Sequence, residues 1–192
     1  MILYATKETF ERFNLKLPDE MSDPLIGALS QAVIESESGD RLLEWGAKLF
    51  YFVRRKCIQV VNFASKLTFF LISIKLDDLP ELGNLIAEYL MNLYADDAEM
   101  EKRLKLLFKE YPVVAFSKLK DKSVIATLNH TQRYYLDDGY RLGDYIENGI
   151  MQSRKINRDI NRDWYFTEKV NGKTEYFQSA DKFRELLMKR YP

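Results

Sequence analysis

Three arginines near the end of the chain are the residues whose spacing best suits chemistry. Arg154, Arg158 and Arg162 are four residues apart, so a helix over this segment would place them in one row, here called the arginine ridge. Guanidinium groups in a row suit phosphates or carboxylates, because each is a planar set of hydrogen-bond donors. The alternative is a solvent-exposed helix that neutralises its own charge, since Lys155 and Asp159 form an i, i+4 pair. The tetrapeptide Ile-Asn-Arg-Asp occurs twice, so Asn157 and Asn161 run parallel to the ridge.

The single histidine, His130, is the only side chain that ordinarily titrates near neutrality. A general base of the usual kind would therefore have to be His130, with Asp137 or Asp138 to orient it. This gives one functional hypothesis, an enzyme that acts on a phosphate-bearing substrate with the arginine ridge as its anchor. The alternative is a surface or capping histidine, because the surrounding residues have a helical pattern.

The other side chains that could react or bind metal have structural explanations. Cys57 lies in an apolar strand pattern, which favours a buried thiol, although the basic residues Arg55 and Lys56 could lower its pKa if it were exposed. Acidic doublets could hold Mg²⁺, but they stand where helix caps and a turn are expected. These doublets are Asp77-Asp78, Asp96-Asp97 and Asp137-Asp138. Because the sequence has no phosphate-binding glycine loop, no His-Glu-x-x-His and no nucleophile elbow, we expect neither a cofactor nor a metal.

Composition sets limits on the class of protein. The 192 residues carry 29 basic and 29 acidic side chains, with 46% hydrophobic and 30% charged residues, as in an ordinary globular protein. One cysteine and one histidine exclude a disulfide framework and a zinc site built from those residues. The most apolar stretch, residues 67–74, is too short to cross a bilayer, and the first residues have no signal-peptide pattern. We therefore expect a cytoplasmic protein without membrane contact.

The balanced total charge conceals blocks of one sign. Residues 19–44 hold seven acids against one arginine, and residues 45–76 hold six basic residues and no acid. Residues 77–101 hold eight acids and no basic residue, after which the sign reverses again. Such blocks can steer a macromolecular partner, or they can pack side by side and neutralise each other.

The elements that position these residues indicate a single α+β domain over residues 1–192. We expect a mainly antiparallel sheet covered by helices on both faces, with a C-terminal β-hairpin and helix at 164–192. Strand-like runs at 48–53, 57–62 and 67–74 form a meander that is apolar on both faces. Phe50, Tyr51, Phe69 and Phe70 should therefore be buried, which argues against a sheet surface that stacks RNA bases.

Helical periodicity and turn signals place the remaining elements. Helices are predicted around residues 7–13, 25–34, 82–93, 100–111, 123–136, 150–163 and 180–191, and short strands at 2–6 and 113–116. Asp96 is the expected N-cap of the fourth helix and Ser179 that of the last one. Asn171-Gly172 predicts a type I′ hairpin turn, and the polar residues 35–40 predict a flexible loop.

Several short motifs, in order along the chain, resemble one family of small bacterial proteins, the domain-of-unknown-function family 6933. They are Met1-Ile2-Leu3 with Thr6-Lys7, Trp45 before Arg54-Arg55-Lys56-Cys57, Val61-Asn62, the 123–129 stretch that ends in Asn129, and Asn157-Arg158 or Asn161-Arg162. Lys122 and Ala126 stand where the family pattern has Arg and Gly. The resemblance implies a cytoplasmic bacterial protein of plasmid or phage context, without an assigned reaction. The matching polar residues suit a shared binding site or a set of turns and caps: Arg54, Arg55, Lys56, Asn129 and Arg158.

Together these observations favour a non-enzymatic protein that binds a macromolecular partner. Its binding residues would be the arginine ridge with Arg54, Arg55, Lys56 and Asn129. A protein or nucleoprotein partner is expected, with direct nucleic-acid binding as a further possibility. The plasmid or phage context implied by the resemblance would make interference with a host protein plausible.

Overall fold

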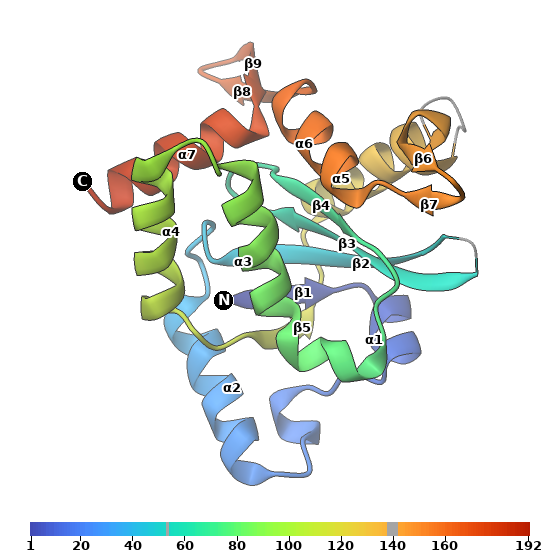
Figure 1. Ribbon diagram of the computed structural model, residues 1–192. Coiled ribbons are helices and arrows are strands. Elements are labelled where there is room, and N and C mark those ends of the chain that lie inside the picture. Colours follow the sequence, from blue (N-terminus) through green and yellow to red (C-terminus); the bar gives the residue numbers. More distant parts are fainter. Residues whose placement is uncertain (53, 138–141) are drawn as a thin grey trace.

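The computed structural model describes residues 1–52, 54–137 and 142–192, and its centre is a five-stranded sheet (Figure 1). The strands are β1 (Ile2–Ala5), β2 (Glu44–Phe52), β3 (Arg55–Asn62), β4 (Thr68–Leu71) and β5 (Ala115–Lys118), in the spatial order β4-β3-β2-β1-β5. β2, β3 and β4 form the predicted antiparallel meander, while β1 pairs in parallel with both β2 and β5. With its helices and C-terminal hairpin, the fold confirms the α+β class.

One face of the sheet is covered by four helices. They are α1 (Lys7–Phe13), α3 (Leu82–Leu93), α4 (Ala98–Glu110) and α7 (Ser179–Arg190). The predicted apolar stripe of α3 is buried here through Leu82, Ile86, Leu90 and Leu93. The N-cap of α4 is Asp97 and not Asp96, because the Asp97 carboxylate accepts the Met100 backbone N–H at 3.1 Å. Arg184 donates to the same carboxylate at 2.7 Å, and this hydrogen bond lowers the pKa of Asp97.

Three helices cover the opposite face. α2 (Pro24–Glu37) packs over β1 and β5, and α5 (Lys122–Gln132), which continues into a π-helical turn (Arg133–Asp137), packs over β2 and β3. α6 (Ser153–Arg162) lies along β4, the edge strand of the sheet (Figure 1). The predicted apolar side of α5 is buried through Val124, Leu128, Thr131 and Tyr135.

The expected burial of both sheet faces is confirmed for Phe50, Phe69 and Phe70 but is wrong for Tyr51. The Tyr51 side chain is 52% exposed. Tyr51 pairs with Lys56 near the tip of the β2–β3 hairpin. The neighbouring strands stop short of this point, since β1 pairs with β2 only as far as Ala47 and β4 reaches only Ile58 of β3. The tip therefore projects beyond the part of the sheet that the helices cover.

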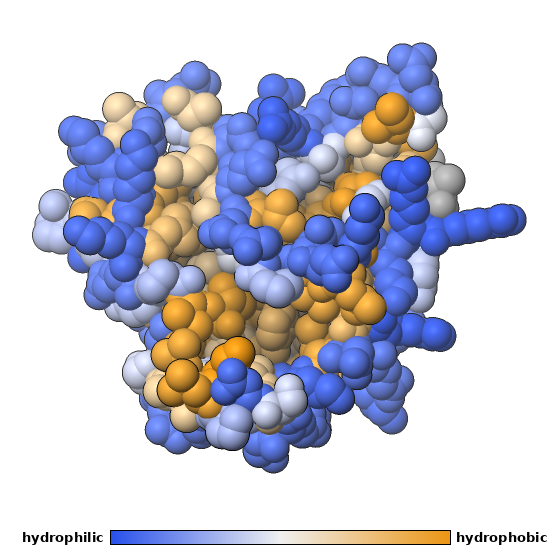
Figure 2. Space-filling view, turned by 60° about the horizontal axis from the view of Figure 1, so that its bottom comes forward, coloured by the Kyte–Doolittle hydropathy of each residue, from blue (hydrophilic) through white to orange (hydrophobic). Residues whose placement is uncertain are grey.

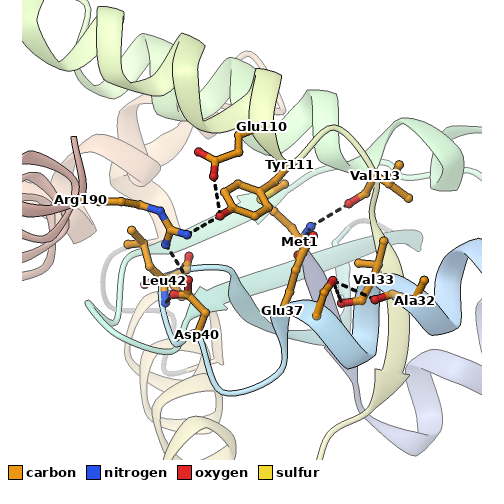
Figure 3. Close-up of polar contacts among 12 residues, drawn as sticks. Met1, Ala32, Val33, Glu37, Asp40, Leu42, Glu110, Tyr111, Val113 and Arg190 are labelled. Atoms are coloured by element: carbon orange, nitrogen blue, oxygen red, sulfur yellow. Dashed lines mark hydrogen bonds and ion pairs between the residues drawn. The ribbon is translucent and has the colours of Figure 1, made fainter.

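The segment 35–40, predicted to be a loop, is one only from Ser38 onward, and its first three residues belong to α2. α2 continues to Glu37, whose carboxylate is buried beside the amino group of Met1 at 2.6 Å (Figure 3). Three residues later, Asp40 accepts a hydrogen bond from Arg190 of α7 at 2.7 Å. The polar side chains of this segment are thus anchored to distant parts of the chain, which sequence periodicity does not reveal.

The C-terminal hairpin follows the prediction closely. β8 (Tyr165–Val170) and β9 (Lys173–Gln178) are joined at Asn171 and Gly172, whose φ angles of 51° and 78° fit the type I′ turn. Ser179, however, is the first residue of α7 and not its N-cap. The Ser179 hydroxyl is buried and lies 2.8 Å from Oδ1 of Asn161, so it links α7 to α6.

Short elements complete the fold. They are 3₁₀ turns at Pro18–Glu20, Leu76–Glu81 and Leu142–Tyr145. A small hairpin is formed by two strands of two residues each, β6 (Ile146–Glu147) and β7 (Ile150–Met151). Within the described ranges, every helix is too short or too polar to cross a membrane.

Candidate functional site

A groove between α3 and α6 is the candidate site, because it brings two of the predicted binding residues together where one ligand could contact both. It encloses about 470 Å³. α3 and α6 form its two walls, and Phe69 of β4 contributes to its lining. The lining residues are Phe69, Tyr89, Asn92, Leu93, Gln152, Arg154, Lys155, Asn157 and Arg158. Two of the three arginines of the predicted ridge therefore line a single hollow.

Arg154 and Arg158 keep most of their side chains in solvent. The exposed fraction is 71% for Arg154 and 65% for Arg158. Arg154 reaches across the groove to Glu88 of α3 at 3.1 Å, whereas Arg158 contacts the carboxylate of its own neighbour Asp159 at 3.4 Å. Such exposed ion pairs contribute little to stability, so both guanidinium groups can exchange their partner for a ligand at small cost.

The third arginine of the ridge has a different role. Arg162 donates to the backbone carbonyl of Leu93 at the end of α3 and lies over the ring of Tyr94. This contact satisfies a helix-terminal carbonyl that lacks a partner within its own helix. Arg162 is therefore a structural bridge between α6 and α3, and only Arg154 and Arg158 remain as candidates for binding.

The ion pair expected between Lys155 and Asp159 is not the contact that Lys155 makes. Its ammonium group donates to the backbone carbonyl of Asp144 at 3.0 Å and lies 5.7 Å from the centre of the Tyr145 ring. Lys155 thereby holds the turn before β6 against α6. The expectation that α6 neutralises its own charge holds only for the contact between Arg158 and Asp159.

The parallel row of Asn157 and Asn161 fixes α6 to the sheet. Asn157 accepts the backbone N–H of Phe70 at 2.7 Å and donates to its carbonyl at 3.1 Å. Asn161 makes the same two contacts with Thr68, at 2.8 and 2.7 Å. Both amides are fully buried and pair the edge of β4 as a further strand would. The duplicated tetrapeptide thus places an asparagine inside and an arginine outside on successive turns.

The basic residues Arg54, Arg55 and Lys56 lie elsewhere, at the tip of the β2–β3 hairpin. Arg54 has a φ of 63°, as a residue in a tight turn can, and Arg55 donates to Ser73 at 3.4 Å. Lys56 donates to the carbonyl of Arg12 at 2.7 Å and lies above the Phe13 ring. For these residues the interpretation as turn and contact residues fits the structure, and they do not line the α3–α6 groove.

Asn129 and His130 are also separate from the groove. Both are exposed near the end of α5. Asn129 accepts a hydrogen bond from Lys48 at 2.8 Å, and the ring of His130 lies 6.0 Å from that of Trp164. Neither residue is part of the groove lining, so the structure does not place His130 beside the two ridge arginines as the enzyme hypothesis requires.

The single thiol has no open approach. Cys57 is fully buried, its sulfur accepts the backbone N–H of Ser73 at 3.3 Å, and burial raises its pKa. The acidic doublets are capping or surface residues where the structure describes them, with Asp78 accepting the Lys75 N–H at 2.7 Å. The side chain of Asp137 and the whole of Asp138 lie outside what the structure describes, and among the described residues no cluster of acids, cysteines and histidines suits a metal ion.

Sequence reasoning missed the α3 wall of the groove. Tyr89 belongs to the apolar stripe that the sequence predicts for α3, Asn92 stands beside that stripe, and the Tyr89 hydroxyl lies 3.0 Å from that of Ser153. No local pattern marks either residue as part of a groove lining, because that role depends on α3 packing beside α6, some 60 residues later. A signal was present in the acidic block at 77–101, whose Glu88 now faces Arg154 across the groove.

Chemically, the groove offers two largely exposed guanidinium groups at its rim above an apolar and amide lining. Such a rim suits carboxylate or phosphate oxygens, which accept two parallel N–H bonds from one arginine. Among the lining residues that the structure describes, no nucleophile is paired with a base. The arrangement supports binding of an anionic group.

The family that matches this chain is the domain of unknown function DUF6933, whose model covers residues 2–182 of the 192. The chain belongs to this family. No curated protein and no solved structure matches it. The DUF6933 match spans the sheet, the groove and the first turn of α7, so both walls of the α3–α6 groove belong to the family's domain.

Proposed function

We propose that this DUF6933 protein is a non-enzymatic binding protein whose α3–α6 groove receives an acidic segment of a partner protein. The observation that carries the proposal is the position of Arg154 and Arg158, which line one groove of about 470 Å³ while their side chains stay largely exposed. A carboxylate of the partner would replace Glu88 or Asp159 as the acceptor. The bacterial, plasmid or phage context implied by the motif resemblance is compatible with interference with a host protein.

An acidic protein segment is favoured over single-stranded nucleic acid by the state of the aromatic residues. Nucleic-acid strands bind through bases stacked on exposed rings. Phe50, Phe69 and Phe70 are all buried, and the exposed ring of Tyr51 lies at the tip of the β2–β3 hairpin and not in the groove lining, so these rings form no stacking platform beside the groove.

The proposal is tested by affinity capture from the cytoplasm of the source cells, with mass spectrometry and nucleic-acid sequencing of what co-purifies. We expect a protein partner that R154E/R158E no longer retains. The matched control is K105E/K109E, which reverses two charges with the same spacing on the exposed side of α4. Retention of the same partner by R154E/R158E, or recovery of nucleic acid alone, would contradict the proposal.

A further inference from the structure

Glu44, the first residue of β2, carries a buried carboxylate that is only partly satisfied. The residue is 5% exposed. Its Oε1 accepts two hydrogen bonds, one from the Tyr4 hydroxyl and one from the Gly39 backbone N–H, each at 3.0 Å. Within the described ranges no group donates to Oε2, and Glu44 forms no ion pair. Because a buried charge is costly unless it is paired or hydrogen-bonded, Oε2 is an acceptor suited to a ligand.

The carboxylate of Glu44 contributes to a groove between the end of α2 and the start of α5, here called the Glu44 groove. It encloses about 470 Å³, a volume typical of small-molecule sites. The rings of Tyr4 and Phe63, whose centres are 5.2 Å apart, form part of its lining. Because Oε2 has no partner and yet is not among the fully enclosed polar atoms, it opens into this groove.

The other end of the Glu44 groove is positively charged. Lys118, the last residue of β5, and Lys120 line it and are exposed. In the part of the chain that the structure describes, neither ammonium group has a hydrogen bond or an ion pair. Arg41 and Asp121 also line the groove, but they pair with each other at 3.0 Å and so neutralise each other. Two cations are thus available to an anion.

The distance between the two ends limits the ligand. Glu44 is level with Ile2 of β1, whereas Lys118 is level with Ala5, three residues further along. The ends are therefore about 10 Å apart along the strand direction. An α-amino acid is too short to reach both, because its amino and carboxylate groups are attached to the same carbon. Two lysines also suit a phosphate, with a charge of about −1.5 to −2 at neutral pH, better than a single carboxylate.

We propose that the Glu44 groove binds a phosphate monoester of a hydroxylated molecule, namely a sugar phosphate or a nucleoside monophosphate. Lys118 and Lys120 hold the phosphate, and a sugar hydroxyl donates to Oε2 of Glu44. Among the residues that the structure describes, this site shares none of its lining with the α3–α6 groove. The two sites therefore stand or fall independently.

The surface of α2 shows that apolar contact is not what recognises this ligand. Figure 2 shows the exposed apolar side chains of α2 gathered toward the lower left of the view. These are Leu25, Ile26 and Leu29, and the lining of the Glu44 groove includes none of them. Its described lining is mainly polar, which suits a hydroxylated and charged ligand better than a lipid.

Isothermal titration calorimetry of the full chain with ribose 5-phosphate and with adenosine monophosphate tests the proposal. We expect saturable binding that E44Q and K118E/K120E each weaken at least about tenfold. E44Q keeps an oxygen for Tyr4 and Gly39 but presents an amide N–H₂ to the ligand, and this group cannot accept a hydrogen bond. The matched controls are E35Q, at an exposed glutamate of α2, and K105E/K109E on α4. Both should bind within about twofold of the wild type, and circular dichroism checks that every variant folds.

Inorganic phosphate, used as a third probe, separates the two ends of the groove. It should bind more weakly than the esters, lose affinity in K118E/K120E and stay within about twofold in E44Q, because it does not reach Glu44. Tighter binding of adenosine monophosphate than of ribose 5-phosphate assigns the ligand to nucleotides, and the equal or reverse order assigns it to sugar phosphates. The proposal is overturned if neither ester binds at about 5 mM, or if E44Q binds both as the wild type does. It is also overturned if inorganic phosphate binds as tightly as the esters, since the lysines alone would then form the site.

Discussion

Asn157 and Asn161 hold the edge of the sheet with their side-chain amides, so the stability of the fold depends on both residues. Replacing either one by leucine leaves the N–H and the carbonyl of one β4 residue buried without a partner. An unpaired buried group of this kind costs about 1–3 kcal/mol. We therefore expect Asn157→Leu and Asn161→Leu each to lower the free energy of unfolding by about 2–4 kcal/mol, measured by guanidinium denaturation.

The matched control for these substitutions is Asn129→Leu on α5. Asn129 is exposed and accepts only the hydrogen bond of Lys48 among the contacts described above. Its replacement should change the free energy of unfolding by less than about 0.5 kcal/mol. Equal losses for Asn129 and Asn161 would mean that the paired amides are not what secures β4.

Cys57 gives a second prediction at the scale of one residue. Because burial raises the pKa of its thiol, the reactive thiolate is scarce at neutral pH, and the sulfur is also closed to reagents. We expect labelling by a disulfide reagent at pH 8 to be slow in the folded protein and fast after guanidinium is added. Rapid labelling without denaturant would show that the thiol is accessible and active.

Among the elements, α2 and the turn at Pro18–Glu20 provide a test in which two effects oppose each other. Helix propensity favours Ala over Gly by about 1 kcal/mol. At Gly27, however, the added Cβ would lie 2.5 Å from a backbone oxygen, which cannot move as a side chain does. Overpacking of this kind costs about 1–3 kcal/mol. We expect Gly27→Ala to lower the melting temperature, and a higher melting temperature would show that the turn is loosely packed.

The elements also show which local sequence signals are enough to predict structure and which are not. Asn171-Gly172 predicted its hairpin correctly because a two-residue turn depends on the conformation of those residues alone. The loop expected at 35–40 begins only at Ser38, because α2 extends to Glu37, whose carboxylate meets the amino group of Met1 far away in the sequence. The predicted burial of Tyr51 was wrong for a similar reason, since its exposure depends on where β1 and β4 stop beside the hairpin.

At the scale of the whole molecule, periodicity predicted most helices and the meander but not how they are brought together. The parallel pairing of β1 with β2 and β5 follows from contacts between segments that no local pattern connects. The candidate site was predicted in part, because the spacing of Arg154 and Arg158 marks one face of α6. The opposing wall of α3 depends on packing, and the acidic block at 77–101 gave only an indirect signal of it through Glu88. The structural role of Arg162 also depends on packing, and the spacing of the arginines does not reveal it.

The central claim, that the α3–α6 groove binds an acidic protein segment, is tested most directly with a fluorescein-labelled oligoglutamate peptide. Anisotropy titrations would compare the wild type with R154E/R158E and with K105E/K109E at one ionic strength. We predict saturable binding that R154E/R158E weakens at least about tenfold, a loss of about 1.4 kcal/mol, while K105E/K109E stays within about twofold of the wild type. Equal weakening by both variants, or binding that survives R154E/R158E, would contradict the assignment of the groove.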